Sequence, residues 1–215
     1  MIYLLLADGF EEVEALTPLD LLRRAGKTVL TVSITNEHAV RGAHDITVLA
    51  DLSADEVTAP CDEMLILPGG TPGTKNLDAS PLTDRLIREV VAHGGRLAAI
   101  CAAPLILGRR DLLNGKAATC YPGFEEELIG ATLSEAPCVT DGCVTTAAGA
   151  GAALLFGAEL VRVLCGSDVS EALLVALREP HAVEEKKRRD AFLTREQLIR
   201  DLGAAPEDGD GSSSN

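Results

Sequence analysis

Short apolar runs and longer amphipathic stretches follow one another along most of the chain. The apolar runs, which predict buried strands, span residues 2–6, 28–34, 64–67, 97–100 and 143–146. Hydrophobic residues recur at helical spacing in residues 11–24, 82–93, 102–107 and 151–164. Two further short runs, 39–42 and 46–50, predict a hairpin. Because strands alternate with helices, we expect an α/β fold in which helices cover both faces of a mostly parallel sheet.

The chain is long enough for one compact domain followed by an extension. It has 215 residues, of which 47% are hydrophobic, and this length and content predict one domain and a tail. Residues 178–203 hold a run of charges and predict a charged, partly helical extension, whose short helix would begin at a capping box at 194–197. Residues 204–215 are rich in Gly, Ser and acidic residues and predict a disordered tail.

Composition excludes several classes of function. A net charge of −14 would repel nucleic-acid phosphates, and the chain has no Trp to stack on bases. No run approaches the ~18–20 apolar residues of a membrane span. Residues 1–6 are apolar but too few for the core of a signal peptide. We therefore expect a cytoplasmic protein that binds neither nucleic acid nor membranes.

Cys101 is the candidate reactive residue among six cysteines. The six are too few and too scattered for a disulfide scaffold in a chain of this length. None of them stands in a CxxC pair, which argues against a structural zinc site, so we expect no metal. Cys101 lies at the bend between a predicted strand and a predicted helix. The positive end of a helix favours a thiolate there, and unrelated hydrolases place a nucleophilic serine on such a bend. The alternative is a buried structural cysteine.

Acidic residues gather at the start of the first predicted helix. The helix dipole alone accounts for Glu11 and Glu12. Glu14 differs, because Pro18 has no N–H to donate to the Glu14 carbonyl and is expected to loosen the helix there. Such irregular backbone is more frequent at functional sites than elsewhere.

A glycine-rich segment follows the third predicted strand. Residues 68–73 read Pro-Gly-Gly-Thr-Pro-Gly, which is neither a Walker P-loop nor a dinucleotide-binding fingerprint. The segment is either a plain turn or a source of backbone N–H groups for an anion. An oxyanion that develops beside Cys101 would be such an anion.

Taken in order, these motifs resemble the ThiJ/PfpI superfamily. Residues 9–15 read Gly-Phe-Glu-Glu-Val-Glu-Ala, residues 67–70 read Leu-Pro-Gly-Gly, and residues 99–104 read Ala-Ile-Cys-Ala-Ala-Pro. The likeness is greatest to the branch of the Parkinsonism-associated protein deglycase and bacterial YajL. It covers residues 1–177 and implies a flavodoxin-like three-layer sandwich that forms a homodimer and needs no cofactor.

The resemblance implies a role for individual residues. Cys101 matches the reactive, oxidation-prone cysteine of the family, and Glu14 matches a protonated glutamic acid that hydrogen-bonds its sulfur. The backbone N–H groups of Gly70 and Ala102 match an oxyanion-binding pair. We therefore predict that the Glu14 carboxyl lies within hydrogen-bonding distance of the Cys101 sulfur, with a raised pKa. Its proton would then lower the pKa of the thiol.

Two positions depart from part of the family. Many members have a Thr-His-Pro stretch where this chain has Cys120 and Tyr121, which leaves no evident base except Glu14. The resemblance places this segment near the Cys101 pocket, where Cys120 is a candidate redox partner. Ala102 stands where the protease-like branch has histidine, which argues against a Cys-His peptidase.

The resemblance implies an enzyme that detoxifies 2-oxoaldehydes such as methylglyoxal without glutathione or cofactor. The Cys101 sulfur would form a hemithioacetal, and Glu14 would move a proton between adjacent carbons. Release of groups from glycated proteins is a related activity. A redox sensor or holdase, in which Cys101 is oxidised to a sulfinate, would use the same residues, and the sequence leaves both functions open. A class I amidotransferase is disfavoured, because no His-x-Glu pair accompanies the cysteine.

Overall fold

The computed structural model describes residues 1–203 and divides into two units. The first unit is Met1–Leu173, and the second begins at Leu174. The tail predicted for 204–215 lies outside the described residues. Over the part of the chain that the structure describes, no helix combines the length and apolarity that a membrane crossing requires.

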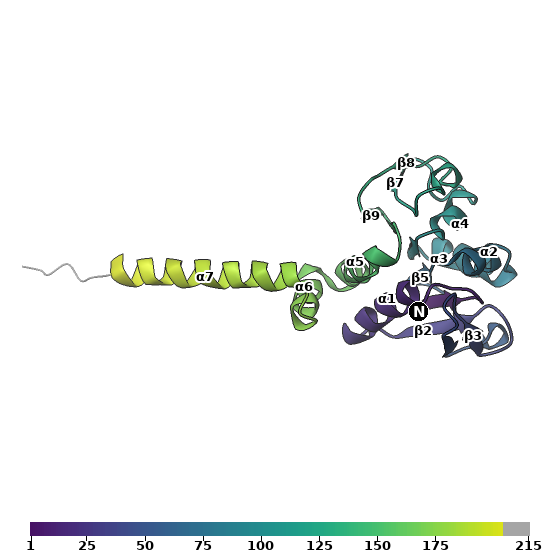
Figure 1. The fold of residues 1–215 in the computed structure, drawn as a ribbon, viewed down its shortest axis with the longest axis horizontal. Coiled ribbons are helices and arrows are strands. Elements are labelled where there is room, and N and C mark those ends of the chain that lie inside the picture. Colours follow the sequence, from purple (N-terminus) through teal and green to yellow (C-terminus); the bar gives the residue numbers. More distant parts are fainter. Residues whose placement is uncertain (204–215) are drawn as a thin grey trace, which may run out of the picture. The chain divides into compact units, whose positions relative to one another are not determined.

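A six-stranded sheet forms the centre of the first unit (Figure 1). Its strand order is β2-β1-β5-β6-β10-β9, and only β9 runs antiparallel to its neighbour. The strands are β1 (Ile2–Leu6), β2 (Val29–Ser33), β5 (Met64–Leu67), β6 (Arg96–Ile100), β9 (Cys138–Asp141) and β10 (Val144–Ala147). The central strands are continuous apolar runs because a parallel sheet is buried on both faces. The predicted α/β fold is therefore confirmed.

Helices cover both faces of this sheet. They are α1 (Glu12–Arg24), α2 (Thr71–Asp78), α3 (Pro81–Ala92), α4 (Pro104–Gly108) and α5 (Ala153–Cys165). Tyr3 and Leu5 of β1 join a core with Leu86 of α3 and Leu105 of α4. Alternate residues of a strand point to opposite faces, so the buried Leu4 faces the other layer, where α1 packs against α5.

Pro18 lies inside α1, which runs without a break from Glu12 to Arg24. The proline is buried against α5, where a Cβ on Gly157 would lie 3.0 Å from the Pro18 Cα. The glycine thus lets the two helices approach closely at the proline. Tertiary packing of this kind holds a residue that costs about 3 kcal/mol in a free helix.

The glycine-rich segment after β5 leads into a helix, although its glycines and prolines are typical of a turn. α2 begins at Thr71, directly after Gly70, and Pro72 is tolerated because it lies in the first turn.

The predicted hairpin is present as β3 (Ala39–Arg41) and β4 (Thr47–Leu49). The smaller elements are η1 (Ala54–Glu56), β7 (Ala117–Ala118), η2 (Glu125–Glu127), β8 (Thr132–Leu133), η3 (Ala150–Ala152) and α6 (Ser167–Ala176).

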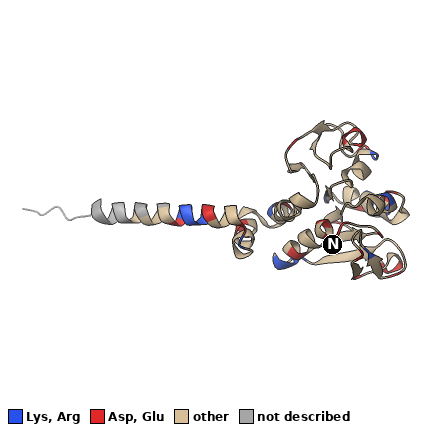
Figure 2. Ribbon diagram, viewed as in Figure 1, with Lys and Arg blue, Asp and Glu red and all other residues tan. Residues whose placement is uncertain are grey.

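The C-terminal helix α7 (Pro180–Gly203) is longer than the sequence predicts. The expected start at the capping box of 194–197 is wrong, because Thr194 lies inside α7 and its hydroxyl donates to the Asp190 carbonyl at 2.8 Å. The helix begins instead at Pro180, where the Glu179 side chain accepts from the Ala182 N–H at 2.7 Å. The charge run belongs to α7, where opposite charges follow one another (Figure 2).

Candidate active site

Cys101 lies on a strained bend between β6 and α4. Its φ of +65° is in the left-handed region, which residues other than glycine seldom adopt. The Cys101 N–H donates to the Ala147 carbonyl of β10 at 2.8 Å, so the neighbouring strand fixes the bend. Strain of this kind persists only where the surrounding structure enforces it, and it is concentrated at active sites. The predicted strand-to-helix bend is present, although regular helix starts only at Pro104.

Glu14 is buried in the first turn of α1, with 1% of its surface exposed. Its Oε2 accepts from the Gly69 N–H at 2.9 Å, whereas Oε1 is buried without a hydrogen-bond partner. Burial raises the pKa of Glu14 to about 7, although a hydrogen bond with Cys101 acts in the opposite direction. The predicted rise in the Glu14 pKa is therefore found. A carboxyl that titrates near neutral pH can both take and return a proton there.

Gly69 lets Glu14 and Cys101 meet. A Cβ at position 69 would lie 2.6 Å from the Cys101 Cβ and would overlap the Glu14 Oε2. The side chains of Glu14 and Cys101 thus converge on the same side of Gly69, and a hydrogen bond between them influences the pKa of each. The structure therefore brings together two residues from segments far apart in the sequence.

The pKa of the Cys101 thiol differs from its predicted direction. Burial and the adjacent Glu14 carboxylate raise it to about 12, whereas the N–H groups of Gly70 and Ala102 lower it. The expected fall does not occur because removal of the sulfur from water outweighs two backbone donors. At neutral pH, the thiol keeps a proton beside a carboxylate that is ready to accept it. The sulfur therefore becomes a strong nucleophile when its proton passes to Glu14.

Gly70 supplies a backbone N–H that only glycine can place. Its φ is +93°, and a Cβ would lie 2.7 Å from the Glu11 nitrogen. The backbone N–H groups of Gly70 and Ala102 both lower the pKa of the Cys101 thiol. Their role as donors to an oxyanion stays a prediction.

Cys120 and Tyr121 flank the site on a further segment. The Tyr121 N–H donates to the Cys101 carbonyl at 2.8 Å, and its side chain is 50% exposed. Cys120 is buried, and burial raises its pKa to about 11. A thiol that exchanges rapidly needs exposure and a low pKa. Cys120 has neither property, so the structure favours Cys120 as a neighbour of the site and disfavours it as a redox partner.

Glu12 of α1 forms hydrogen bonds with the turn between β3 and β4. Its carboxylate accepts from the backbone N–H and the ring Nδ1 of His44, each at 2.7 Å. With Glu11, these residues form the one group in the described part of the chain that has the geometry to hold a cation. Their existing hydrogen bonds account for the arrangement as a structural ion pair, and the predicted absence of a metal stays untested.

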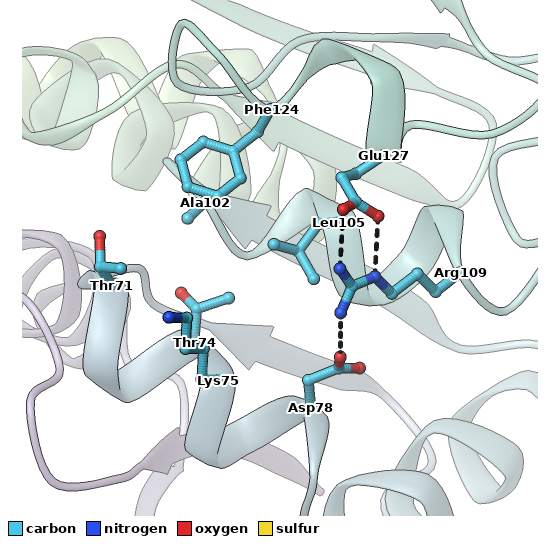
Figure 3. Close-up of a pocket in the computed structure, with 9 residues that line it drawn as sticks. All are labelled: Thr71, Thr74, Lys75, Asp78, Ala102, Leu105, Arg109, Phe124 and Glu127. Carbon is cyan, nitrogen blue, oxygen red and sulfur yellow. Dashed lines mark hydrogen bonds and ion pairs between the residues drawn. The ribbon is translucent and has the colours of Figure 1, made fainter.

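A pocket of about 230 Å³ lies beside Ala102, between α2 and α4 (Figure 3). Thr71, Thr74, Lys75 and Asp78 line it from α2, and Leu105, Arg109, Phe124 and Glu127 line the opposite side. No local sequence pattern predicts these residues. Thr74 follows glycines and prolines that are typical of a turn, and Phe124 belongs to a loop with no periodic pattern.

The buried Glu14 makes stability depend on pH. Folding raises its pKa from 4.5 to about 7, so the folded protein binds more protons than the unfolded chain between these values. The free energy of unfolding should therefore fall by about 3 kcal/mol as the pH rises from 4.5 to 7. Urea unfolding of the parent and Glu14→Gln at pH 5 and pH 8 measures this contribution. Equal pH dependence of the two proteins would contradict it.

Comparisons with known proteins agree with this geometry. A profile described as the DJ-1/PfpI family matches residues 1–163. Protein dj-1beta of Drosophila melanogaster is 34% identical over 178 residues, which are 80% of this chain and 95% of that protein. A protein of Pyrococcus abyssi named as a deglycase is 33% identical over 144 residues, or 66% of this chain and 85% of that protein.

A solved structure shows the same likeness in three dimensions. The C103A mutant of a DJ-1 superfamily protein from Salmonella typhimurium is 30% identical, with a TM-score of 0.78. The match covers 83% of this chain and 98% of that chain. Together with the profile match, this likeness shows that the chain belongs to the DJ-1/PfpI family.

Proposed function

We propose that the protein converts 2-oxoaldehydes such as methylglyoxal into 2-hydroxy acids without a cofactor. The observation that carries this proposal is the convergence of the Cys101 and Glu14 side chains at Gly69, where burial raises the pKa of Glu14 to about 7. A nucleophile beside a base that titrates near neutral pH suits an aldehyde, which needs covalent addition and proton transfer but no external oxidant.

In the first step, the Cys101 sulfur adds to the aldehyde carbon. A carbon–sulfur bond forms, the thiol proton passes to Glu14, and the carbonyl π electrons move to oxygen. The N–H groups of Gly70 and Ala102, which lower the pKa of the Cys101 thiol, would stabilise this oxyanion. Glu14 then returns its proton to the oxygen to give a hemithioacetal.

In the second step, Glu14 moves a proton from one carbon to the next. Its carboxylate removes the proton from the former aldehyde carbon, which gives an enediolate with the charge on the former ketone oxygen. That oxygen takes the proton of the neighbouring hydroxyl, the carbonyl of the thioester forms, and Glu14 returns its proton to the adjacent carbon. The product is a thioester of Cys101. Water hydrolyses this thioester, releasing the 2-hydroxy acid and restoring the thiol, so the net reaction adds one water and involves no oxidant.

Deglycation of proteins would follow from the same adduct. A 2-oxoaldehyde that has added to an amine or thiol of a protein would be transferred to Cys101 and released as a hydroxy acid. The deglycase name of the Pyrococcus abyssi relative supports this second use. The partners proposed are therefore a small aldehyde or a glycated protein.

Purified protein incubated with methylglyoxal tests the proposal. We expect lactate to accumulate over many turnovers without glutathione or added metal. Lactate is measured with a coupled assay, and intact-mass spectra follow the adduct on the protein. Stoichiometric modification of Cys101 without lactate would contradict the proposed turnover.

A redox role is the second candidate. A solved structure of Toxoplasma gondii DJ-1, described as oxidised, supports this role. Its sequence is 28% identical to this chain, and the TM-score is 0.77. A sulfinate on Cys101 would accept a hydrogen bond from protonated Glu14. Low peroxide concentrations would then add two oxygen atoms to Cys101 and alter holdase activity, while methylglyoxal turnover would be absent.

We further propose that the protein acts as a cytoplasmic homodimer. Homodimers are common in the family to which the chain belongs. Neither nucleic acid nor a membrane is proposed as a partner, since the net charge of −14 disfavours binding to anionic surfaces. Light scattering at micromolar concentration measures the assembly, and a monomer mass would contradict it.

Gly69→Ala should separate Glu14 from Cys101. The added Cβ would lie 2.6 Å from the Cys101 Cβ, so one of the two side chains must shift. A displacement of about 1 Å at reacting groups can lower turnover about 100-fold. Gly151→Ala is the matched control, because a Cβ at Gly151 meets nothing within 4 Å. Equal methylglyoxal turnover by the two folded variants would show that the contact is dispensable.

A further inference from the structure

We propose that the pocket between α2 and α4 binds the substituent of the 2-oxoaldehyde, and that it selects an uncharged aromatic group with one hydroxyl. The proposal rests on the proposed function, because it assigns the part of the substrate beyond the reacting carbons. Thr71 and Ala102, which line the pocket, directly follow Gly70 and Cys101 in the chain. The pocket therefore adjoins the reacting cysteine, and we assign to it the part of the substrate beyond the reacting carbons.

The apolar wall of the pocket fits an aromatic ring. Ala102, Leu105 and the ring of Phe124 form this wall on the side of α4 (Figure 3). A wholly apolar cavity of about 150 Å³ holds benzene in another protein. The volume of about 230 Å³ found here leaves room for a ring with a small substituent. A methyl group, as in methylglyoxal, would leave most of it unfilled.

The opposite wall holds a buried hydroxyl that has no partner. Thr74 is 1% exposed, and its Oγ1 makes no hydrogen bond. Threonine in a helix commonly bonds the carbonyl four residues earlier, but Thr74 uses only its backbone N–H for that contact, with Gly70 at 2.7 Å. Figure 3 shows the Thr74 side chain rising from α2, with its methyl carbon toward Leu105 and its hydroxyl oxygen on the side of Thr71. A ligand hydroxyl would satisfy this orphaned group.

The charges around the pocket favour a neutral ligand. Arg109 donates to Glu127 at 2.7 and 2.8 Å and to Asp78 at 2.6 Å, so its charge is already compensated. Lys75 is exposed, and water screens its charge. An anionic substituent would therefore gain little here.

Binding of inert ketones tests the pocket separately from catalysis. The probes are acetophenone, 4-hydroxyacetophenone and 4-carboxyacetophenone, which have no aldehyde. In NMR titrations of the full chain, 4-hydroxyacetophenone should bind most tightly and should shift signals of Leu105 and Phe124. Thr74→Val should weaken its binding about 3- to 10-fold, the value of one hydrogen bond. Thr83→Val is the matched control, because Thr83 is also buried and unpartnered but lies in α3 outside this pocket.

Two results would overturn the proposal. One is equal affinity of 4-hydroxyacetophenone for Thr74→Val and Thr83→Val. The other is tighter binding of 4-carboxyacetophenone, which would assign the pocket to an anion.

Turnover of two aldehydes then connects the pocket to the reaction. The parent should show a kcat/KM for 4-hydroxyphenylglyoxal at least about tenfold above that for methylglyoxal. Thr74→Val should reduce this ratio about 3- to 10-fold, and Thr83→Val should leave the ratio unchanged. If the ketones bind as expected but neither aldehyde is consumed, the pocket stands and the proposed function fails. If methylglyoxal is consumed but the ratio is near one, the pocket assignment fails and the proposed function stands.

Discussion

Cys101→Ser should abolish the turnover of methylglyoxal, with a loss of about 1000-fold or more. Serine retains the size and position of the side chain, but an alcohol is a far weaker nucleophile than a thiol. Burial has already raised the pKa of the thiol to about 12, so the transfer of its proton to Glu14 is uphill even for the thiol. An alcohol at the same position would keep its proton and would not add to the aldehyde.

Cys120→Ser is the matched control for this loss. Cys120 is buried near the site, but its raised pKa of about 11 gives it no proposed chemical role. We expect Cys120→Ser to retain most of the parent turnover, measured as lactate formed per minute. Substantial lactate formation by Cys101→Ser would assign the reaction to another residue.

The order of elements could be predicted because the sheet is buried on both faces. Residues 2–6 and 64–67 are apolar without interruption, and both predicted strands match β1 and β5. α2 was not predicted because Gly70 precedes it and its first turn holds Pro72 and Gly73, all of which are turn residues by local preference. The packing of Leu77 into the core, which is not local information, overrides that preference.

The members of the candidate site could also be predicted, but not the electrostatic balance among them. The resemblance indicated Glu14 and Cys101, and the fold brings them together across Gly69. The direction of the Cys101 pKa depends on the extent of burial, which no local pattern encodes. The pocket beside Ala102 was not predicted either, since its walls come from three separate segments.

The start of α7 could not be predicted from the sequence for a third reason. The residues 194–197 match a capping box, yet a pattern that can begin a helix can also continue one. The acceptor that caps α7 is Glu179, and Pro180 fixes the backbone of its first residue. Because the helical stretch is continuous from Pro180 onward, the helix begins at the earlier of the two signals.

Glu14→Gln should remove both the turnover and its pH dependence. In the parent, kcat/KM should rise with pH through about 7, because only the Glu14 carboxylate can accept the thiol proton. Glutamine retains an oxygen that can accept the Gly69 N–H, which donates to Glu14 at 2.9 Å, but glutamine cannot carry a proton. The loss should be about 100- to 10 000-fold, the usual contribution of a general base.

Stability separates this catalytic loss from a damaged fold. At pH 8, Glu14→Gln should be more stable than the parent, because it replaces a buried charge with a neutral group of the same size. Glu14→Asp retains the carboxyl but not the reach, so it should keep a rise of kcat/KM with pH at a lower rate. The three proteins are compared by rate profiles from pH 5 to pH 9 and by urea unfolding. A Glu14→Gln enzyme whose rate still rises through about 7 would show that another group accepts the proton, and Glu14 would then act only by position.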